Sequence, residues 1–128
     1  MIVGLGIDVC SIARMQAALG RSGERLWSRI LSEAERSALR ERRDRATALA
    51  GRFAAKEAAL KALRGGRGVS WHELEIVGQP FHPPELRLHG AAARLAAELG
   101  VAQIHVSITH DAGVAAAVVI FEARSPKP

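Results

Sequence analysis

The sequence predicts an α+β fold in which helices pack on an antiparallel sheet, and three observations support this prediction. Residues 2–9 form a short, β-branched apolar run interrupted by two glycines, which is typical of a buried strand. Residues 11–64 carry helix caps and helical spacing of apolar side chains. Residues 104–109 and 114–121 are β-rich runs joined by a short, glycine-containing segment. Helices and strands that are grouped in this way favour an α+β arrangement.

Three helices are expected in the first half of the chain. The first covers residues 11–20, with Ser11 as its N-terminal cap and Gly20 as its terminator. The second covers residues 32–43 and opens with the Ser-x-x-Glu pattern of a capping box. The third is the longest, covers residues 44–64, and stops at a Gly-Gly pair.

Short strands and one more helix are expected in the middle of the chain. Strand signals occur at residues 74–77 and 85–89, with turn residues between them at 78–80 and 83–84. The alanine-rich stretch 91–99 has the composition of a helix that is closed by the glycine after it.

The chain ends in the strongest β signal. Residues 110–113 have the length of a hairpin loop between the two last strands. We expect a single domain over residues 1–123 and a flexible tail over residues 124–128.

Composition suggests how the core is built. Only 4% of the 128 residues are aromatic, although 48% are hydrophobic, so Ala, Leu, Val and Ile must form the core. Small side chains bury little area each, so a domain of this size gains from burial at subunit contacts and is expected to form an oligomer. The single Cys10 excludes an internal disulfide, and residues 1–9 lack the basic leader of a signal peptide. A cytoplasmic location is therefore expected.

The excess of positive charge is concentrated near the start of the chain. The formal net charge is +5, and residues 11–45 contain nine arginines against five acidic residues. A basic surface favours anionic partners such as nucleic acid, an acidic protein, an acidic membrane or a phosphorylated metabolite. Two solvated helix faces explain the same charge pattern equally well.

The stretch 52–61 (RFAAKEAALK) places charged residues next to an apolar helix face. At about 100° per residue, Glu57 lies about 40° and Lys56 about 60° from Phe53, inside or at the margin of the apolar stripe, and Lys61 lies at its edge. A surface Glu57–Lys61 pair would stabilise the helix by only about 0.3–0.5 kcal/mol. That gain does not offset the desolvation of a carboxylate, so a functional Glu57, facing a divalent cation or a phosphate, is favoured.

Asp8 poses a similar choice at the end of the first predicted strand. Its simplest role is to cap the helix that follows. Two carboxylates from different elements are, however, a common way to hold Mg²⁺ together with waters and substrate phosphates. Asp8 and Glu57 form a weak motif by themselves.

The last predicted hairpin has one polar face. Alternation sends Ile104, Val106 and Ile108 to one side of the strand, and His105, Ser107 and Thr109 to the other. A polar face of this kind is either exposed to solvent or forms the wall of a site. His110 and Asp111, at the turn, are most simply loop residues.

Taken together, these segments resemble the holo-acyl-carrier-protein synthases, the small trimeric class of 4'-phosphopantetheinyl transferases. The matching motifs are residues 4–9 (GLGIDV) with 12–14 (IAR), residues 52–58 (RFAAKEA) with Lys61, and residues 105–110 (HVSITH). Residues 78–80 (GQP) resemble the Gly-Lys-Pro turn of the family. The similarity covers nearly the whole chain and implies the 4'-phosphopantetheinyl transferase-like fold.

The resemblance implies an activity and a set of site residues. A carrier-protein serine attacks the β-phosphate of coenzyme A, receives the 4'-phosphopantetheine group, and releases adenosine 3',5'-bisphosphate, a step of fatty acid biosynthesis. Asp8 and Glu57 would bind Mg²⁺, while Lys61 and His110 would act at the reacting centre. Coenzyme A would contact a set of five residues: Lys61, Arg52, Gly66, Thr109 and His110.

The resemblance also implies partners. Arg14, Arg21 and Arg25 match the family's surface for the acidic helix of acyl carrier protein. The family forms homotrimers whose active sites lie between subunits, so Asp8 and Glu57 of one subunit would work beside residues of a neighbour.

The sequence departs from the family pattern in two places, and it leaves two alternative functions open. The loop at residues 64–68 (RGGRG) replaces the family's Gly-Thr-Gly turn, and Ser11 stands where an acidic residue is common. The same chemistry on polyketide or peptide-synthetase carriers is one alternative. A small basic nucleic-acid-binding module is the other, although such modules normally expose aromatic side chains for stacking.

Overall fold

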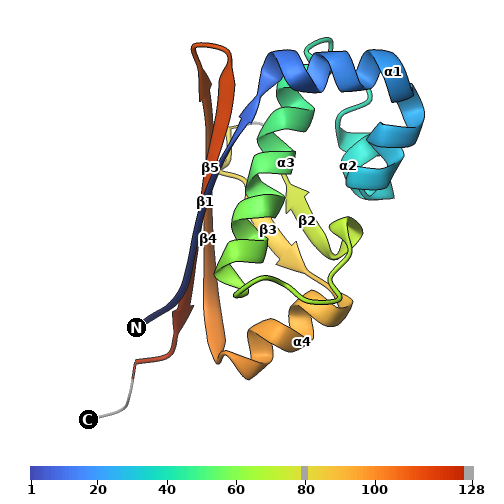
Figure 1. Ribbon diagram of the computed structural model, residues 1–128. Coiled ribbons are helices and arrows are strands. Elements are labelled where there is room, and N and C mark those ends of the chain that lie inside the picture. The colour runs from blue at the N-terminus through green and yellow to red at the C-terminus, as the bar shows by residue number, and fades with distance from the viewer. Residues whose placement is uncertain (79–80, 126–128) are drawn as a thin grey trace.

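The computed structural model describes residues 1–78 and 81–125. A three-stranded sheet forms one layer, and the helices and a small second hairpin form the other (Figure 1). The elements in chain order are β1 (Ile2–Ser11), α1 (Ile12–Ile30), α2 (Glu33–Ala38), α3 (Arg45–Ala62), the 3-10 turn η1 (Trp71–Glu73), β2 (Leu74–Val77), β3 (Glu85–Leu88), α4 (Gly90–Glu98), β4 (Val101–Asp111) and β5 (Val114–Ala123). The α+β prediction is confirmed.

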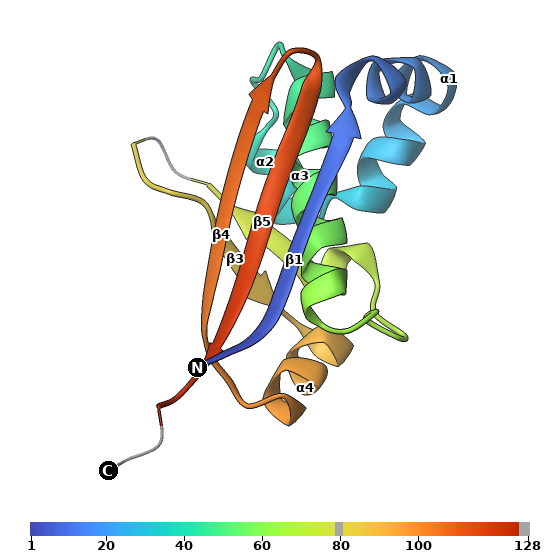
Figure 2. The same ribbon diagram turned by 60° about the vertical axis from the view of Figure 1, so that its left-hand side comes forward.

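The main sheet is antiparallel and has the order β1-β5-β4. The last strand of the chain therefore lies in the centre, and β1 and β4 form the two edges. Helix α3 covers one face of the sheet, while the other face is bare in the single chain (Figures 1 and 2). The short hairpin β2–β3 packs beside α3 on the covered side (Figure 1).

Helix α3 lies unusually close to β1 because two glycines of the strand have no side chain. A Cβ built on Gly6 would overlap the carbonyl oxygen of Ala58, and one on Gly4 would overlap that of Ala62. The helix itself is lined with alanines, and Ala54, Ala58 and Ala62 are among its fully buried residues. The predicted core of small aliphatic residues is confirmed, because close approach of backbones replaces large side chains.

Residues 2–9 form the expected strand, but within the single chain only one of its faces is covered. Alternation along β1 sends Gly6 into the contact with α3 and sends Leu5, Ile7 and Val9 to the bare face. These three side chains remain 61%, 65% and 63% exposed. The run is uniformly apolar, and its pattern therefore hides the fact that only one face is covered within the chain.

Helix α1 does not end at Gly20. It passes Gly20 and is interrupted at Gly23, whose φ of 47° and ψ of −125° are not helical, and a second helical segment then runs to Ile30. Burial of Trp27 and Ile30 compensates the poor helix propensity of the two glycines. The cap at Ser11 is confirmed, since its hydroxyl accepts a hydrogen bond from the backbone N–H of Arg14 at 3.2 Å.

The second helix has the predicted start but a different end. The capping box is confirmed: the Ser32 hydroxyl accepts the Glu35 N–H at 3.2 Å, and the Glu35 carboxylate accepts the Ser32 N–H at 3.0 Å. The helix ends at Ala38 instead of residue 43, and a turn follows.

The loop of the β4–β5 hairpin is shorter than predicted. It contains only Ala112 and Gly113, both with positive φ (50° and 81°), as a two-residue turn that matches the twist of the strands requires. His110 and Asp111 therefore belong to β4 and pair with Ala115 and Val114. Their assignment to a loop is wrong.

The middle of the chain agrees with the prediction within a residue or two. The structure has β2 and β3 at the expected places, and α4 is followed by Gly100 with a φ of 75°. Gln79 and Pro80, the core of the predicted turn, lie outside the described residues, as do residues 126–128 of the predicted tail. Within the described ranges, no helix is long and apolar enough to cross a membrane.

Candidate active site

Asp8, Glu57 and Lys61 come together where β1 crosses α3. Asp8 lies on the covered face of β1, two residues after the Gly6 contact. Lys61 lies one turn after Glu57 on α3, and its Nζ is 3.2 Å from Oδ1 of Asp8 and donates a hydrogen bond to the carbonyl of Ile7 at 2.9 Å. The structure thus brings together the three residues that the resemblance placed at the reacting centre. Asp8 is a mid-strand residue, so its possible role as a helix cap is wrong.

The electrostatics of this cluster favour a cation between the carboxylates. The pKa of Glu57 is raised, first by burial and then by repulsion from Asp8, while Lys61 opposes the shift. Burial also raises the pKa of Cys10, with further contributions from Asp8 and Glu57. Two carboxylates that repel each other, with one lysine as partial compensation, form a site of unbalanced negative charge.

The residues present fit a divalent cation that is completed by substrate. Within residues 1–78 and 81–125, no group of three or more His, Cys, Asp or Glu side chains could enclose a metal ion. Mg²⁺ commonly takes one or two carboxylates and fills its other positions with waters and phosphate oxygens. Asp8 and Glu57 match that donor set, whereas a metal held entirely by protein would not fit.

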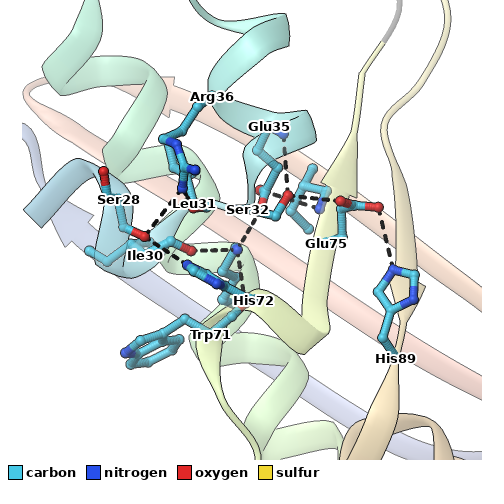
Figure 3. Close-up of polar contacts among 12 residues, drawn as sticks. Ser28, Ile30, Leu31, Ser32, Glu35, Arg36, Trp71, His72, Glu75 and His89 are labelled. Carbon is cyan, nitrogen blue, oxygen red and sulfur yellow. Dashed lines mark hydrogen bonds and ion pairs between the residues drawn. The ribbon is translucent and has the colours of Figure 1, made fainter. Parts of the chain in front are cut away.

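The fully buried charge in α3 is Lys56, not Glu57. The Lys56 side chain is 0% exposed, and its Nζ donates to the Glu35 carboxylate at 2.6 Å and to the carbonyls of Ile30 and Trp71 at 2.7 and 3.0 Å. Figure 3 shows Glu35, Ile30 and Trp71, which supply these three acceptors. The helical projection placed Lys56 and Glu57 alike inside or at the margin of the apolar stripe and did not distinguish them. The signal that could have revealed the burial of Lys56 is the surrounding run of alanines, which leaves room for neighbouring elements on every side.

The remaining predicted coenzyme residues lie elsewhere. Asp8 pairs with Ala117, which in turn pairs with Ile108, so Asp8 is two strand spacings, about 10 Å, from β4. His110 lies a further two residues along β4, about 7 Å, and Gly51 of α3 faces Ile108 between the two groups. A single chain therefore keeps His110 apart from Asp8.

His110 and Arg52 lie toward the β4 edge. The pKa of Asp44 is lowered first by its hydrogen bond with Arg42 and, among smaller effects, by the charge of His110, so His110 lies near the N-terminus of α3. Arg52 points toward the β2–β3 hairpin, where a Cβ on Gly78 would be 3.4 Å from Nη2 of Arg52. Thr109 is exposed on the bare face of the sheet.

The Arg52 guanidinium lacks a hydrogen-bond partner for one of its nitrogens within the described part of the chain. Its Nε is buried and finds no hydrogen-bond partner among the described residues, and burial lowers the pKa of its guanidinium. A buried arginine without a partner is costly. This side chain therefore fits a role in which an anion, such as a phosphate, supplies the partner.

Gly66 lies in the loop that follows α3, on the side of Lys61. It is buried with a φ of 57°, and a Cβ there would overlap the side chain of Leu60. The positive φ and the nearby Leu60 side chain favour glycine at this turn. Arg64, just before it, also has a positive φ (60°) and is exposed.

The arginines predicted to contact a carrier are exposed along α1. Arg14, in the first turn, borders a cavity of about 400 Å³ between α1, β1 and α3. Residues of this cavity are Val9, Cys10, Ser11, Arg14, Met15, Ala18, Leu26, Ile30 and Phe53. Arg21 and Arg25 are exposed further along the helix. The sequence did not predict this largely apolar cavity next to a charged helix face.

Comparisons with known proteins agree with the fold and identify the family. The model of the 4'-phosphopantetheinyl transferase superfamily matches residues 4–119. The holo-[acyl-carrier-protein] synthase of Anaeromyxobacter sp. (strain K) is 48% identical over 129 aligned positions, which cover 98% of this chain and 100% of that protein. The crystal structure of the Neisseria meningitidis holo-[acyl-carrier-protein] synthase matches with a TM-score of 0.84 at 28% identity, covering 95% of this chain and 99% of that one. The Helicobacter pylori enzyme in complex with coenzyme A matches with a TM-score of 0.78 at 32% identity, covering 92% and 99%.

The chain therefore belongs to the 4'-phosphopantetheinyl transferase superfamily. Within this class of enzymes it is a member of the holo-[acyl-carrier-protein] synthases, which transfer the 4'-phosphopantetheine group from coenzyme A to acyl carrier protein. The alternative of a nucleic-acid-binding module is thereby set aside.

Proposed function

We propose that this chain transfers 4'-phosphopantetheine from coenzyme A to a serine of acyl carrier protein in fatty acid biosynthesis, in the cytoplasm, at the cluster of Asp8, Glu57 and Lys61. The observation that carries the proposal is the meeting of these three side chains at the crossing of β1 and α3, with the 3.2 Å contact between Lys61 and Asp8.

Asp8 and Glu57 would hold Mg²⁺, which supplies positive charge to the pyrophosphate of coenzyme A when it is bound. The Lys61 ammonium, 54% exposed, is free to turn from Asp8 to a phosphate oxygen. The carrier serine oxygen then forms a bond to the β-phosphorus, and the bond from that phosphorus to the bridging oxygen breaks. Adenosine 3',5'-bisphosphate leaves with the bond electrons, and the serine proton passes to a carboxylate or a water at the site.

A homotrimer with shared sites would complete the coenzyme pocket. The bare face of the main sheet supports this part of the proposal, because it carries a set of apolar side chains: Leu5, Ile7, Val9, Ala116, Val118 and Ile120. Contact with a second copy on this face would bury them. It would also allow Arg52, Thr109 and His110 of one copy to approach Asp8 and Glu57 of another.

The carrier would dock on α1. Arg14, Arg21 and Arg25 offer positive charge to the acidic helix of acyl carrier protein. The cavity beside Arg14 adds an apolar recess of about 400 Å³ for a carrier side chain. Because Arg14 lies close to Asp8 along the chain, docking there would bring the carrier serine to the carboxylates.

A mass measurement tests the proposed reaction. Apo-acyl carrier protein incubated with this protein, coenzyme A and Mg²⁺ should gain the mass of one phosphopantetheine, and a chelator should abolish the gain. An unchanged carrier mass across several carriers and divalent metals would overturn the proposal. Apo-carrier domains from polyketide and peptide synthetases, assayed in parallel, test the alternative carriers: faster modification of those domains would reassign the substrate.

A further inference from the structure

Lys56, in its buried pair with Glu35, connects α3 to the end of α1, and both helices line the cavity beside Arg14. The three acceptors of Lys56 come from three parts of the chain: Ile30 at the end of α1, Glu35 in α2, and Trp71 in η1. All three contacts are made by one ammonium that is 0% exposed. A single side chain of α3 thus contacts three elements: α1 and α2, which follow each other in the chain, and η1, which is distant from them in sequence.

Two of these contacts involve residues that line the cavity or pack against its lining. Ile30, whose carbonyl Lys56 binds, lines the cavity with its side chain. Trp71, whose carbonyl Lys56 also binds, packs against Phe53 with ring centroids 5.3 Å apart, and Phe53 lines the cavity as well. Lys56 therefore contacts one lining residue directly, through the Ile30 carbonyl, and a second one, Phe53, through Trp71.

Stability alone does not explain why a buried ion pair occupies this place. An apolar pair of similar volume would usually be as stable or more stable, because two charges lose their hydration on burial. Burial does lower the pKa of Lys56, and the negative charge of Glu35 opposes that shift. What the ammonium provides, and a methyl group would not, is three directional hydrogen bonds to fixed acceptors.

From this geometry we propose that Lys56 is a positioning residue for carrier docking: it fixes Ile30 and Phe53 so that the cavity beside Arg14 is preformed for the carrier. The inference rests on the proposed docking of the carrier on α1. Lys56 touches neither coenzyme A nor the reacting atoms in this scheme. Its loss should therefore raise the KM for carrier and leave the KM for coenzyme A unchanged.

The test separates stability from docking by using two variants that both lower stability but differ in docking. The double variant Lys56→Met/Glu35→Leu removes both charges together, but it leaves the N–H groups of Ser32 and Ile76 and the carbonyls of Ile30 and Trp71 without these partners, so it should melt at a lower temperature than the wild type. It should also raise the KM for carrier about tenfold, with the KM for coenzyme A within twofold of the wild type. In Glu35→Gln, Lys56 still binds the carbonyls of Ile30 and Trp71; this variant should melt at a lower temperature but keep a near-wild-type KM for carrier.

Glu75→Gln is the matched control. Glu75 accepts the Ser32 hydroxyl at 2.7 Å and belongs to the same polar cluster (Figure 3). Within the described residues it forms no hydrogen bond with Lys56, Ile30 or Trp71, and only its charge acts on Lys56. It should leave both KM values unchanged. If the apolar double variant does not fold, Lys56→Gln/Glu35→Gln, a neutral pair that keeps a donor and an acceptor, serves for the same measurement.

The outcomes distinguish the positioning role of Lys56 from the docking of the carrier on α1. A wild-type KM for carrier in a folded double variant, together with a raised KM in Arg14→Ala, would overturn the role of Lys56 alone. A wild-type KM for carrier in Arg14→Ala would overturn docking on α1. Equal increases in both KM values in the double variant would indicate a general disturbance of the fold and would also contradict the positioning role.

Discussion

Gly6 of β1 lies directly against the backbone carbonyl of Ala58 in α3, so closely that a Cβ at Gly6 would overlap the oxygen atom. The neighbours of these two residues are the candidate catalytic carboxylates: Glu57 precedes Ala58, and Asp8 follows Gly6 on the same face of the strand. The spacing between the two carboxylates is therefore set by a contact that only glycine permits.

Gly6→Ala should lower both stability and activity. The added methyl group must push α3 away from β1, which we expect to cost about 1–3 kcal/mol in the free energy of unfolding and to move Glu57 from Asp8. Urea denaturation and turnover measure the two effects. Gly20→Ala is the control, since nothing lies within 4 Å of a Cβ at Gly20; it should stabilise α1 by about 0.5–1 kcal/mol and leave turnover unchanged. A fully active, equally stable Gly6→Ala would contradict the account.

Asp8→Asn and Glu57→Gln should each abolish turnover while the protein stays folded. Each change keeps the shape of the side chain and removes one negative charge from the proposed Mg²⁺ site. Both should also weaken Mg²⁺ binding in the presence of coenzyme A, measured by calorimetry. Circular dichroism checks the fold, and turnover near the wild-type rate in either variant would refute the assignment.

Arg14→Ala should raise the KM for carrier and weaken its dependence on salt. Arg14 borders the cavity on α1 and is exposed, so it acts on the approach and the docking of an acidic partner. We expect an increase of about three- to tenfold at low salt, which becomes smaller as salt screens the charge. Arg94→Ala removes the same charge from α4 and should have no effect on the KM for carrier. Equal effects of the two variants would indicate that net charge alone matters.

Mixing two inactive variants should restore activity if sites are shared between copies. Asp8→Asn lacks a carboxylate at the β1 edge, and His110→Ala lacks the imidazole at the β4 edge. In mixed trimers, about a quarter of the interfaces would combine an intact Asp8 with an intact His110, because the copies assemble at random. A mixture of Asp8→Asn and Glu57→Gln should stay inactive, since both residues come from the same copy. No recovery in the first mixture would contradict the shared site.

Glu75 should stabilise the fold at neutral pH but not in acid. Its pKa is lowered, first by the hydrogen bond from Ser32 and then, against the cost of burial, by His89. The stabilisation is therefore present above the ordinary value of 4.5 and is lost as the pH falls through the lower, folded-state pKa. Glu75→Gln should cost about 1 kcal/mol at neutral pH and nothing once the carboxyl is protonated. Glu85→Gln, an exposed acid of the same hairpin, should show no such pH-dependent loss.

Local sequence signals predicted the parts of the fold that depend on neighbouring residues. The capping box at Ser32, the faces of β4 and the β2–β3 pair follow from spacing alone. Gly20 was misleading, because the helix passes it and breaks only at Gly23, and the burial of Trp27, seven residues and about 10 Å of helix rise after Gly20, stabilises the segment that follows. Tertiary packing, which no local window contains, therefore decides where the helical segments lie.

The candidate site was predicted only in part for the same reason. The resemblance identified Asp8, Glu57 and Lys61, and the structure places them together. The burial of Lys56 depends on which elements surround α3, and the separation of His110 from Asp8 depends on the strand order β1-β5-β4. Neither can be obtained from the periodicity of one segment.

The alternation of β1 has a consequence for how such a protein can change during evolution. Odd positions of the strand supply the apolar surface, and even positions supply Gly6 and Asp8, so substitutions on one side leave the other side intact. Insertion or deletion of a single residue within the strand would exchange the two sets and damage chemistry and association at once. We therefore expect lineages of this chain to tolerate point changes at residues 5, 7 and 9 but to keep the length of this strand constant.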